Sequence, residues 1–220
     1  MIKLYDLAAA DDNQRFSPYC WRVRLALAHK GLPVEIIPWR LTEKSVIAFS
    51  NQGLVPVIVD GETVVNDSWK IAEYLEQKYP EPSLFGGSQA QALTLFIKHW
   101  NDGVLAPSLF PLVILDIYKN LDPKDKPYFR ENREQRLGKT LEEFANPSDE
   151  QLSLFRANLE PVRKTLNTAA FIGGDQPNFA DYIILATLQL GYTISPLKFL
   201  EPNDPVFAWR EQILALYNNL

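Results

Sequence analysis

Apolar residues gather in short runs over the first eighty residues and recur at helical spacing beyond them. Near the start, Ile2, Leu4 and Leu7 form a short apolar run that predicts a buried strand. A second β-rich run covers Val34 to Trp39. The change from strand-like to helix-like spacing near residue 80 indicates two parts of different secondary structure.

The segment 53–80 predicts a hairpin followed by a helix. Pro56 to Asp60 reads as a strand that opens on proline, a position that proline tolerates. A tight turn at Asp60-Gly61 then leads into a strand at Thr63 to Asn66. Asp67-Ser68 opens an amphipathic helix whose exposed amides favour an anion.

The remaining helix signals complete the first part. Ser17-Pro18 is a helix start, because serine caps and proline fits the first turn. The helix then runs from Tyr19 to Lys30 and stops at Gly31. Residues 42–50 predict a short helix. The order β-α-β-α-β-β-α over residues 1–80 predicts a thioredoxin-like domain.

Prolines and glycines over residues 81–89 mark a linker, and residues 90–220 predict an all-helical domain. The first helix carries an apolar stripe, and Pro107 and Pro111 must kink or end it. The stripe consists of Leu93, Phe96, Ile97 and Trp100. Further helices are expected at 124–145, 149–168, 179–194 and 205–218, the third of them nearly all apolar and central.

Composition excludes several classes of function. The net charge is −5, so the basic footprint of a nucleic-acid-binding protein is absent. No apolar run approaches the ~20 residues of a membrane span, and the N-terminus reads as a strand and loop rather than a signal peptide. Cys20 is the only cysteine, which fits a reducing cytoplasm. With two distant histidines, His29 and His99, the chain lacks a zinc ligand set.

With these features in place, the chain resembles a cytosolic glutathione transferase from end to end. Three segments resemble the bacterial glutathione-dependent β-aryl etherases of lignin breakdown. They are SPYCWRVRLALAHKG (17–31), DSWKIAEYLEQKYP (67–80) and GGDQPNFADY (173–182). The resemblance implies glutathione as co-substrate, no metal, and a serine hydroxyl that stabilises the glutathione thiolate. It places that hydroxyl at Ser17.

Two other residues compete with Ser17 for the catalytic role. Tyr5 carries a hydroxyl but lies on the first strand, well before the helix start, and we expect it to be structural. Cys20 completes a pattern that resembles the Cys-Pro-Tyr-Cys motif of glutaredoxins, with serine at the nucleophilic position. We expect Cys20 to be a packed core cysteine.

The resemblance also implies a glutathione site. Val55-Pro56 resembles the family's cis-proline turn, from which the Val55 main chain would pair with the cysteinyl part of glutathione. Asp67 and Ser68 would meet the γ-glutamyl end, although many relatives have Glu or Gln where Asp67 stands. Arg40 and Gln52 are candidates for the glycine carboxylate.

The second substrate is expected between the two parts. Apolar and aromatic residues on the first long helix are candidate contacts, although such stripes are more often core. They are Trp100, Leu105, Phe110 and Tyr118. The family commonly forms twofold dimers, so a homodimer is expected.

Three other features have structural interpretations. Asn178 and Asp181 are expected to form a capping box ahead of the apolar helix, with a loss of ~1 kcal/mol of stability if Asp181 is removed. His29, near a helix end, is expected to be solvated or capping. The charged run 122–134 is expected to be a solvated helix face.

The leading hypothesis is therefore an enzyme in which glutathione displaces a leaving group from a hydrophobic, aromatic electrophile. In the etherase version the leaving group is a phenoxide. The alternatives are a Cys20-dependent thiol transferase and a non-catalytic carrier of glutathione or aromatic ligands.

Overall fold

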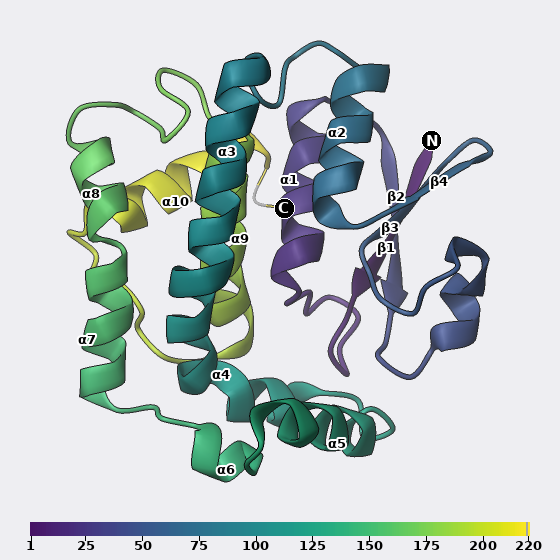
Figure 1. The fold of residues 1–220 in the computed structure, drawn as a ribbon, viewed down its shortest axis with the longest axis vertical. Helices are drawn as coiled ribbons and strands as arrows, with labels where there is room; N and C mark the ends of the chain where they lie inside the picture. The colour runs from purple at the N-terminus through teal and green to yellow at the C-terminus, as the bar shows by residue number, and fades with distance from the viewer. Residues whose placement is uncertain (219) are drawn as a thin grey trace.

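The structure is a computed structural model that describes residues 1–218 and 220. Residues 1–80, which we call the first half of the molecule, contain a four-stranded sheet with the strand order β2-β1-β3-β4 (Figure 1). Its strands are β1 (Ile2–Leu7), β2 (Val34–Trp39), β3 (Val57–Asp60) and β4 (Thr63–Asn66). β1 and β2 pair in parallel, and the other two pairs are antiparallel. The predicted thioredoxin-like order of elements is confirmed.

Helices α1 (Pro18–His29) and α2 (Ser68–Lys78) pack against each other beside this sheet (Figure 1). Gly31 has a φ of 62°, so it ends α1 in a conformation that other residues rarely adopt. The short helix expected at 42–50 is a 3₁₀ helix, η1 (Lys44–Ser50). The predicted hairpin turn is shifted by one residue: Asp60 pairs with Thr63, so the loop is Gly61-Glu62.

The rest of the chain is helical, as expected (Figure 1). Its elements are α3 (Ser88–Trp100), the π-helical turn η2 (Asn101–Leu105), α4 (Ala106–Asn120), α5 (Lys126–Leu137), α6 (Leu141–Phe144), α7 (Asp149–Asn158), α8 (Glu160–Leu166), α9 (Phe179–Ile194) and α10 (Pro205–Leu216). α3 ends before either proline of this region. Pro107 lies at the start of α4, which continues without a gap from the π-helical turn η2, and Pro111 lies inside α4.

Two predicted long helices are each divided in two. The helix expected at 124–145 ends at Gly138, which has a φ of 68°, and restarts as α6 behind a capping box of Thr140 and Glu143. The helix expected at 149–168 is interrupted at Leu159, and Pro161 lies in the first turn of α8. Periodicity alone missed both breaks because the apolar spacing continues across them.

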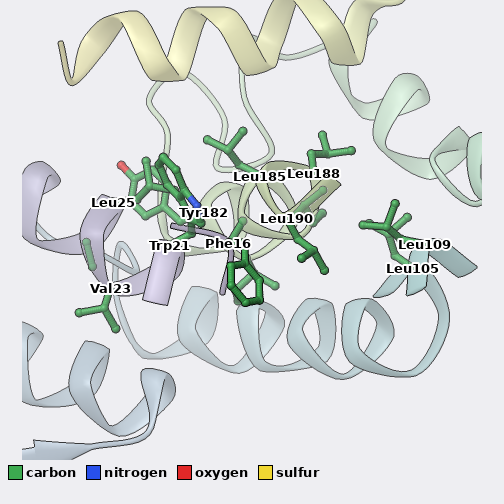
Figure 2. Packing of buried hydrophobic residues seen from close by; sticks show 14 of the residues in the cluster. Phe16, Trp21, Val23, Leu25, Leu105, Leu109, Tyr182, Leu185, Leu188 and Leu190 are labelled. Atoms are coloured by element: carbon green, nitrogen blue, oxygen red, sulfur yellow. The ribbon is translucent and has the colours of Figure 1, made fainter. Parts of the chain in front are cut away.

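α9 is the central buried helix, as its composition predicts. All but two of its residues, Tyr192 and Thr193, are buried. Figure 2 shows Tyr182 and Leu185 of α9 close to Trp21 and Leu25 of α1, so this contact joins the two halves of the molecule. Among the described residues, no helix has both the length and the apolar character required to cross a membrane.

Only part of the apolar stripe of α3 packs against the core. Leu93 and Phe96 are 69% and 71% exposed, and Thr94 is the only buried residue of this helix. Ile97 and Trp100 are half-buried against the core. The helical spacing was therefore predicted correctly, while two of the four stripe residues, Leu93 and Phe96, are exposed.

Candidate functional site

The sheet register brings three predicted site segments to one end of the first half. Tyr5, near the end of β1, pairs with Val57 at the start of β3. Val57 in turn pairs with Asn66 at the end of β4. Three segments therefore lie at the same edge of the sheet. They are the loop that leads from β1 to Ser17, the Val55-Pro56 turn and the helix start at Asp67-Ser68.

Ser17 is the N-cap of α1. Its backbone is extended, with φ −69° and ψ 120°, and its Oγ accepts the N–H of Cys20 at 3.3 Å. The residue is only 5% exposed. Capping uses an acceptor lone pair of the hydroxyl, so the hydroxyl proton remains available for donation. The two interpretations of Ser17, cap and donor, are compatible.

Cys20 is a buried free thiol with no exposed surface. Burial, and after it the nearby charge of Asp6, raises the pKa of the Cys20 thiol well above its usual value. A thiol in this state is a poor nucleophile. The prediction that Cys20 is buried in the core is confirmed.

Sequence reasoning missed Asp6, a buried carboxyl directly behind this helix start. It lies on β1 on the same face as Ile2 and Leu4, and its side chain is 1% exposed. Arg24 approaches it at 3.8 Å, but neither carboxyl oxygen has a hydrogen-bond partner among the described residues. Burial raises the pKa of Asp6, and Arg24 opposes the shift. The sequence did contain a signal for Asp6, because a charged residue stands at an inward-facing position of a strand that was predicted to be buried.

The Val55-Pro56 peptide bond is cis, as the resemblance implied. Val55 precedes β3 and takes part in neither sheet ladder, so the ladders do not use its N–H and C=O. The amide of Gln52 bonds both main-chain groups of Leu54, with Oε1 accepting the Leu54 N–H at 2.7 Å. Gln52 thereby shapes the loop before Val55, a positioning role that the sequence did not suggest.

Asp67 is the N-cap of α2 and has a φ of 70°. Its Oδ1 accepts the N–H groups of Trp69 at 3.0 Å and Lys70 at 3.1 Å. A positive φ at a residue other than glycine is costly and is often found at ligand sites. Asp67 is exposed, whereas Ser68 behind it is 3% exposed.

Arg40 is already paired with acidic residues. Its Nη2 donates to Asp12 at 2.6 Å and to the Ala10 carbonyl at 3.1 Å, while Nε lies 3.4 Å from Asp122. A glycine carboxylate would have to displace Asp12 to bind this guanidinium. Arg40 therefore remains a prediction that requires an exchange of partners.

The four candidate contacts for the second substrate differ in accessibility. Leu105 is fully buried and belongs to the core. Trp100, Phe110 and Tyr118 are half-buried. Phe110 packs on Phe144 with ring centroids 5.8 Å apart, and Tyr118 packs on Phe129 at 6.4 Å. Phe110 and Tyr118 thus contact α6 and α5.

One member of the charged run 122–134 is not solvated. Asp125 has no exposed surface and accepts the N–H groups of Leu41 at 2.9 Å and Thr42 at 3.0 Å, together with the Thr42 hydroxyl at 2.6 Å. It therefore fastens the start of α5 to the segment after β2. The expectation of a solvated face was wrong here because the partners lie more than eighty positions away in sequence.

His29 is neither the solvated nor the capping residue that was expected. Its Nε2 lies 3.0 Å from the Ser83 carbonyl and its Nδ1 lies 2.6 Å from the Tyr182 hydroxyl. The Tyr182 hydroxyl continues to that of Tyr217 at 2.5 Å. This chain of bonds joins α1, the linker, α9 and the end of α10. Burial is the main cause that lowers the pKa of His29.

This network predicts a pH dependence of stability. Because the folded pKa of His29 is lowered, the unfolded chain binds the proton more readily. The contribution of neutral His29 is fully present above the unfolded pKa of about 6.5 and is lost as the pH falls below it. We expect the free energy of unfolding to decrease between pH 7.5 and 5.5, and the decrease to flatten in His29→Gln.

Urea unfolding across this pH range measures the effect, and His99→Gln is the matched control because His99 is exposed. A His29→Gln variant that keeps the slope of wild type would show that His29 is not its source.

Comparisons with known proteins agree with the fold. The family model "Glutathione S-transferase, N-terminal domain" matches residues 13–83, and "Glutathione S-transferase, C-terminal domain" matches residues 92–198. Glutathione S-transferase Z1 of Arabidopsis thaliana is 47% identical over 68 residues, which are 29% of this chain and 31% of that protein. A zeta class transferase of Euphorbia esula is 34% identical over 49% of this chain and 48% of its own length. The matches thus span between about a third and half of these curated relatives.

Solved structures match over nearly the whole chain. Glutathione transferase GSTFuA3 from Phanerochaete chrysosporium superimposes with a TM-score of 0.85 at 25% identity, covering 98% of this chain and 96% of that one. CsGST63524 of Ceriporiopsis subvermispora, solved in complex with glutathione, has the same fold with a TM-score of 0.82 at 23% identity, covering 99% and 96%.

A thioredoxin-like sheet followed by a helical half, both matched by transferase domain models, defines the class of protein. The chain belongs to the glutathione transferase superfamily.

Proposed function

We propose that this protein binds glutathione at the sheet edge described above and stabilises its thiolate with the Ser17 hydroxyl. The observation that carries the proposal is the position of Ser17. It caps α1 through its oxygen, carries a hydroxyl that is also a donor, and starts a helix at the edge that also carries Val55-Pro56 and Asp67-Ser68. The superfamily membership and the glutathione complex of a structural neighbour support it.

Ser17 is sufficient for the chemistry on energetic grounds. An ordinary thiol has a pKa of about 8.5, so lowering it by two units requires roughly 2.7 kcal/mol. A hydrogen bond to a charged acceptor contributes ~1.5–3 kcal/mol, and a helix N-terminus adds ~0.3–1 kcal/mol. The hydroxyl and the start of α1 together supply this free energy without a general base.

The other site residues bind and orient the peptide. The Val55 main chain beside Pro56 adds the cysteinyl part of glutathione as a short strand. Ser68 and the first amides of α2 receive the γ-glutamyl carboxylate, and Asp67 receives its ammonium. Gln52 holds the Val55 loop in place, and Arg40 reaches the glycine carboxylate only if Asp12 moves away.

The proposed reaction is a nucleophilic displacement. The glutathione sulfur forms a bond to an electrophilic carbon of a hydrophobic, aromatic substrate, and the leaving group departs with the bonding electrons. In the etherase form a β-aryl ether carbon is attacked and a phenoxide leaves. We assign glutathione binding to residues 1–80 and the second substrate to residues 90–220, with 81–89 as linker and with Trp100, Phe110 and Tyr118 as partly accessible contacts.

The alternatives are less well supported. A Cys20-dependent thiol transferase requires a reactive thiolate, whereas the Cys20 thiol is fully buried and its pKa is raised. A non-catalytic carrier would keep the glutathione site without turnover. The single buried free thiol fits the cytoplasmic location that the sequence predicts.

Calorimetric titration with glutathione, followed by conjugation assays with 1-chloro-2,4-dinitrobenzene and a β-aryl ether, tests the proposal. We expect saturable binding and turnover of the chloro compound. Binding without turnover of any electrophile would favour the carrier. Turnover that is lost in Cys20→Ser but kept in Ser17→Ala would favour the thiol transferase. The absence of glutathione binding would contradict the proposal altogether.

We also propose a homodimer. Large apolar side chains are exposed on both halves: Phe49, Leu54 and Val64 on the first half, and Leu93 and Phe96 on α3. Contiguous apolar patches are typical of protein interfaces, and a dimer that joins the first half of one subunit to α3 of the other would cover these side chains. We expect Phe96→Asp to halve the mass measured by sedimentation equilibrium. Leu154→Asp, at a 51% exposed leucine of α7, is the control. A wild-type monomer would contradict the proposal.

A further inference from the structure

A cavity of about 270 Å³ lies between α1, the edge strand β2 and the end of α10. α1 contributes Arg24 and Ala28, and the end of α10 contributes Leu216 with the adjoining Tyr217. A further apolar wall consists of Leu32, Val34 and Ile36. Figure 1 marks the C-terminus beside α1, in agreement with this arrangement. Among the residues that the structure describes, the cavity is thus lined mainly by apolar side chains around one cation, Arg24.

This cavity is separate from the proposed glutathione site. Arg24 follows Ser17 by seven residues, which is about 10 Å along the axis of α1. Val34 pairs with Ile2 at the start of β1, whereas the proposed glutathione site lies at the edge where β1 ends. A ligand in the cavity would therefore lie toward the other end of the sheet, away from the Ser17 hydroxyl.

Arg24 has few partners for a largely buried cation. Its side chain is 12% exposed, and its guanidinium lies over the Trp21 ring, 4.3 Å from the ring centre. Asp6, at 3.8 Å, is the only carboxylate within 4 Å of Arg24 in the described part of the chain. Neither Asp6 oxygen nor the Arg24 Nε has a hydrogen-bond partner there. Because a guanidinium carries five N–H donors, Arg24 retains donors for another acceptor.

We propose that this cavity binds a small molecule with an apolar body and a carboxylate, and that Arg24 holds the carboxylate. Ligand sites are typically lined by apolar side chains with a few polar groups that orient the ligand, and drug-sized sites measure about 300–1,000 Å³. The volume of this cavity therefore suits a smaller molecule. The planar fork of arginine matches a carboxylate, and an apolar body would cover Leu216, which is 52% exposed.

Tyr217 connects this cavity to the joint between the two halves of the molecule. Its hydroxyl bonds that of Tyr182, which in turn bonds His29. A ligand in the cavity would contact both α1 and the end of α10. We therefore expect the bound ligand to stabilise this joint and to raise the midpoint of thermal unfolding.

The test compares octanoate with octanamide, which has the same chain length but no charge. Calorimetric titrations are made with saturating S-hexylglutathione, which would fill the proposed glutathione site and the second-substrate site beside it. We expect one octanoate per subunit, bound about tenfold or more tighter than octanamide, as one charged hydrogen bond implies. Octanoate that binds no tighter than octanamide, or that is displaced by S-hexylglutathione, would overturn the inference.

Arg24→Gln is expected to abolish the preference for octanoate over octanamide. Lys119→Gln, at an exposed residue of α4, removes the same charge elsewhere and should keep the preference. Equal preferences in wild type and Arg24→Gln would show that Arg24 does not hold the carboxylate.

A second variant leaves the buried ion pair intact, because Arg24→Gln leaves Asp6 without its cation and can impair folding. Ala28→Leu fills the cavity from α1 with a residue that suits a helix. It should abolish the binding of both compounds, and octanoate binding that is unchanged in Ala28→Leu would refute the site. If S-hexylglutathione itself does not bind, the proposed function fails, while octanoate titrations of wild type and Ala28→Leu still decide this inference.

Discussion

Ser17→Ala is expected to raise the pKa of the bound glutathione thiol back toward about 8.5 and to reduce turnover near pH 6.5 by up to roughly a hundredfold. The physical reason is the loss of the only predicted side-chain donor to the thiolate, while the N–H groups at the start of α1 remain. Ultraviolet titration of the thiolate absorbance in the glutathione complex measures the pKa directly. The pH profile of kcat/KM should shift by the same amount.

Two further substitutions separate the donor from the cap. Ser17→Thr keeps both a hydroxyl and a good N-cap, and it should keep most of the lowered pKa. Ser17→Gly keeps an acceptable N-cap without a hydroxyl, so the pKa of the bound thiol should rise as much as in Ser17→Ala. Its loss of unfolding free energy should be smaller than that of Ser17→Ala. An unchanged thiol pKa in both the alanine and glycine variants would remove Ser17 from the mechanism.

Asp181→Ala is expected to cost about 3–5 kcal/mol of unfolding free energy, because several buried donors lose their acceptor at once. The carboxylate accepts the N–H groups of Ile172 at 2.8 Å, Gly173 at 2.9 Å and Asn178 at 3.0 Å, and the indole N–H of Trp209 at 2.9 Å. It has no exposed surface. The structure therefore implies a larger loss than the ~1 kcal/mol of a simple cap.

Chemical denaturation of Asp181→Ala measures this loss. Asp175→Ala, at an exposed aspartate of the same loop, should change stability by no more than about 0.5 kcal/mol. Asp181→Asn retains one acceptor oxygen, so its loss of unfolding free energy should lie between those of Asp181→Ala and Asp175→Ala. A loss of only about 1 kcal/mol in Asp181→Ala would mean that water replaces the carboxylate at these donors.

The local elements of this protein were predictable because their signals are local. Ser17-Pro18 caps a helix, Gly31 ends it, and Asn178 with Asp181 forms the capping box at the start of α9. Each depends on residues within a few positions of one another. The breaks at Gly138 and Leu159 were missed because a glycine or a Leu-Glu-Pro sequence permits a break without requiring it.

The candidate site was predictable in part. Ser17, Val55-Pro56 and Asp67-Ser68 were found from helix starts, a proline and a family resemblance, and the register of the sheet explains why they share an edge. Gln52 and Arg40 were assigned to a ligand, but their actual partners are the Leu54 main chain and Asp12. Side chains with several donors have many potential partners, and sequence spacing does not choose among them.

The sequence by itself determined the two-part architecture, the element order of the first part and the buried character of α9, because hydrophobic spacing and capping residues act over short distances. Only the tertiary structure decided the burial of His29, Asp125 and Asp6 and the exposure of Leu93 and Phe96. Burial and hydrogen-bond partners at these positions come from elements distant in sequence.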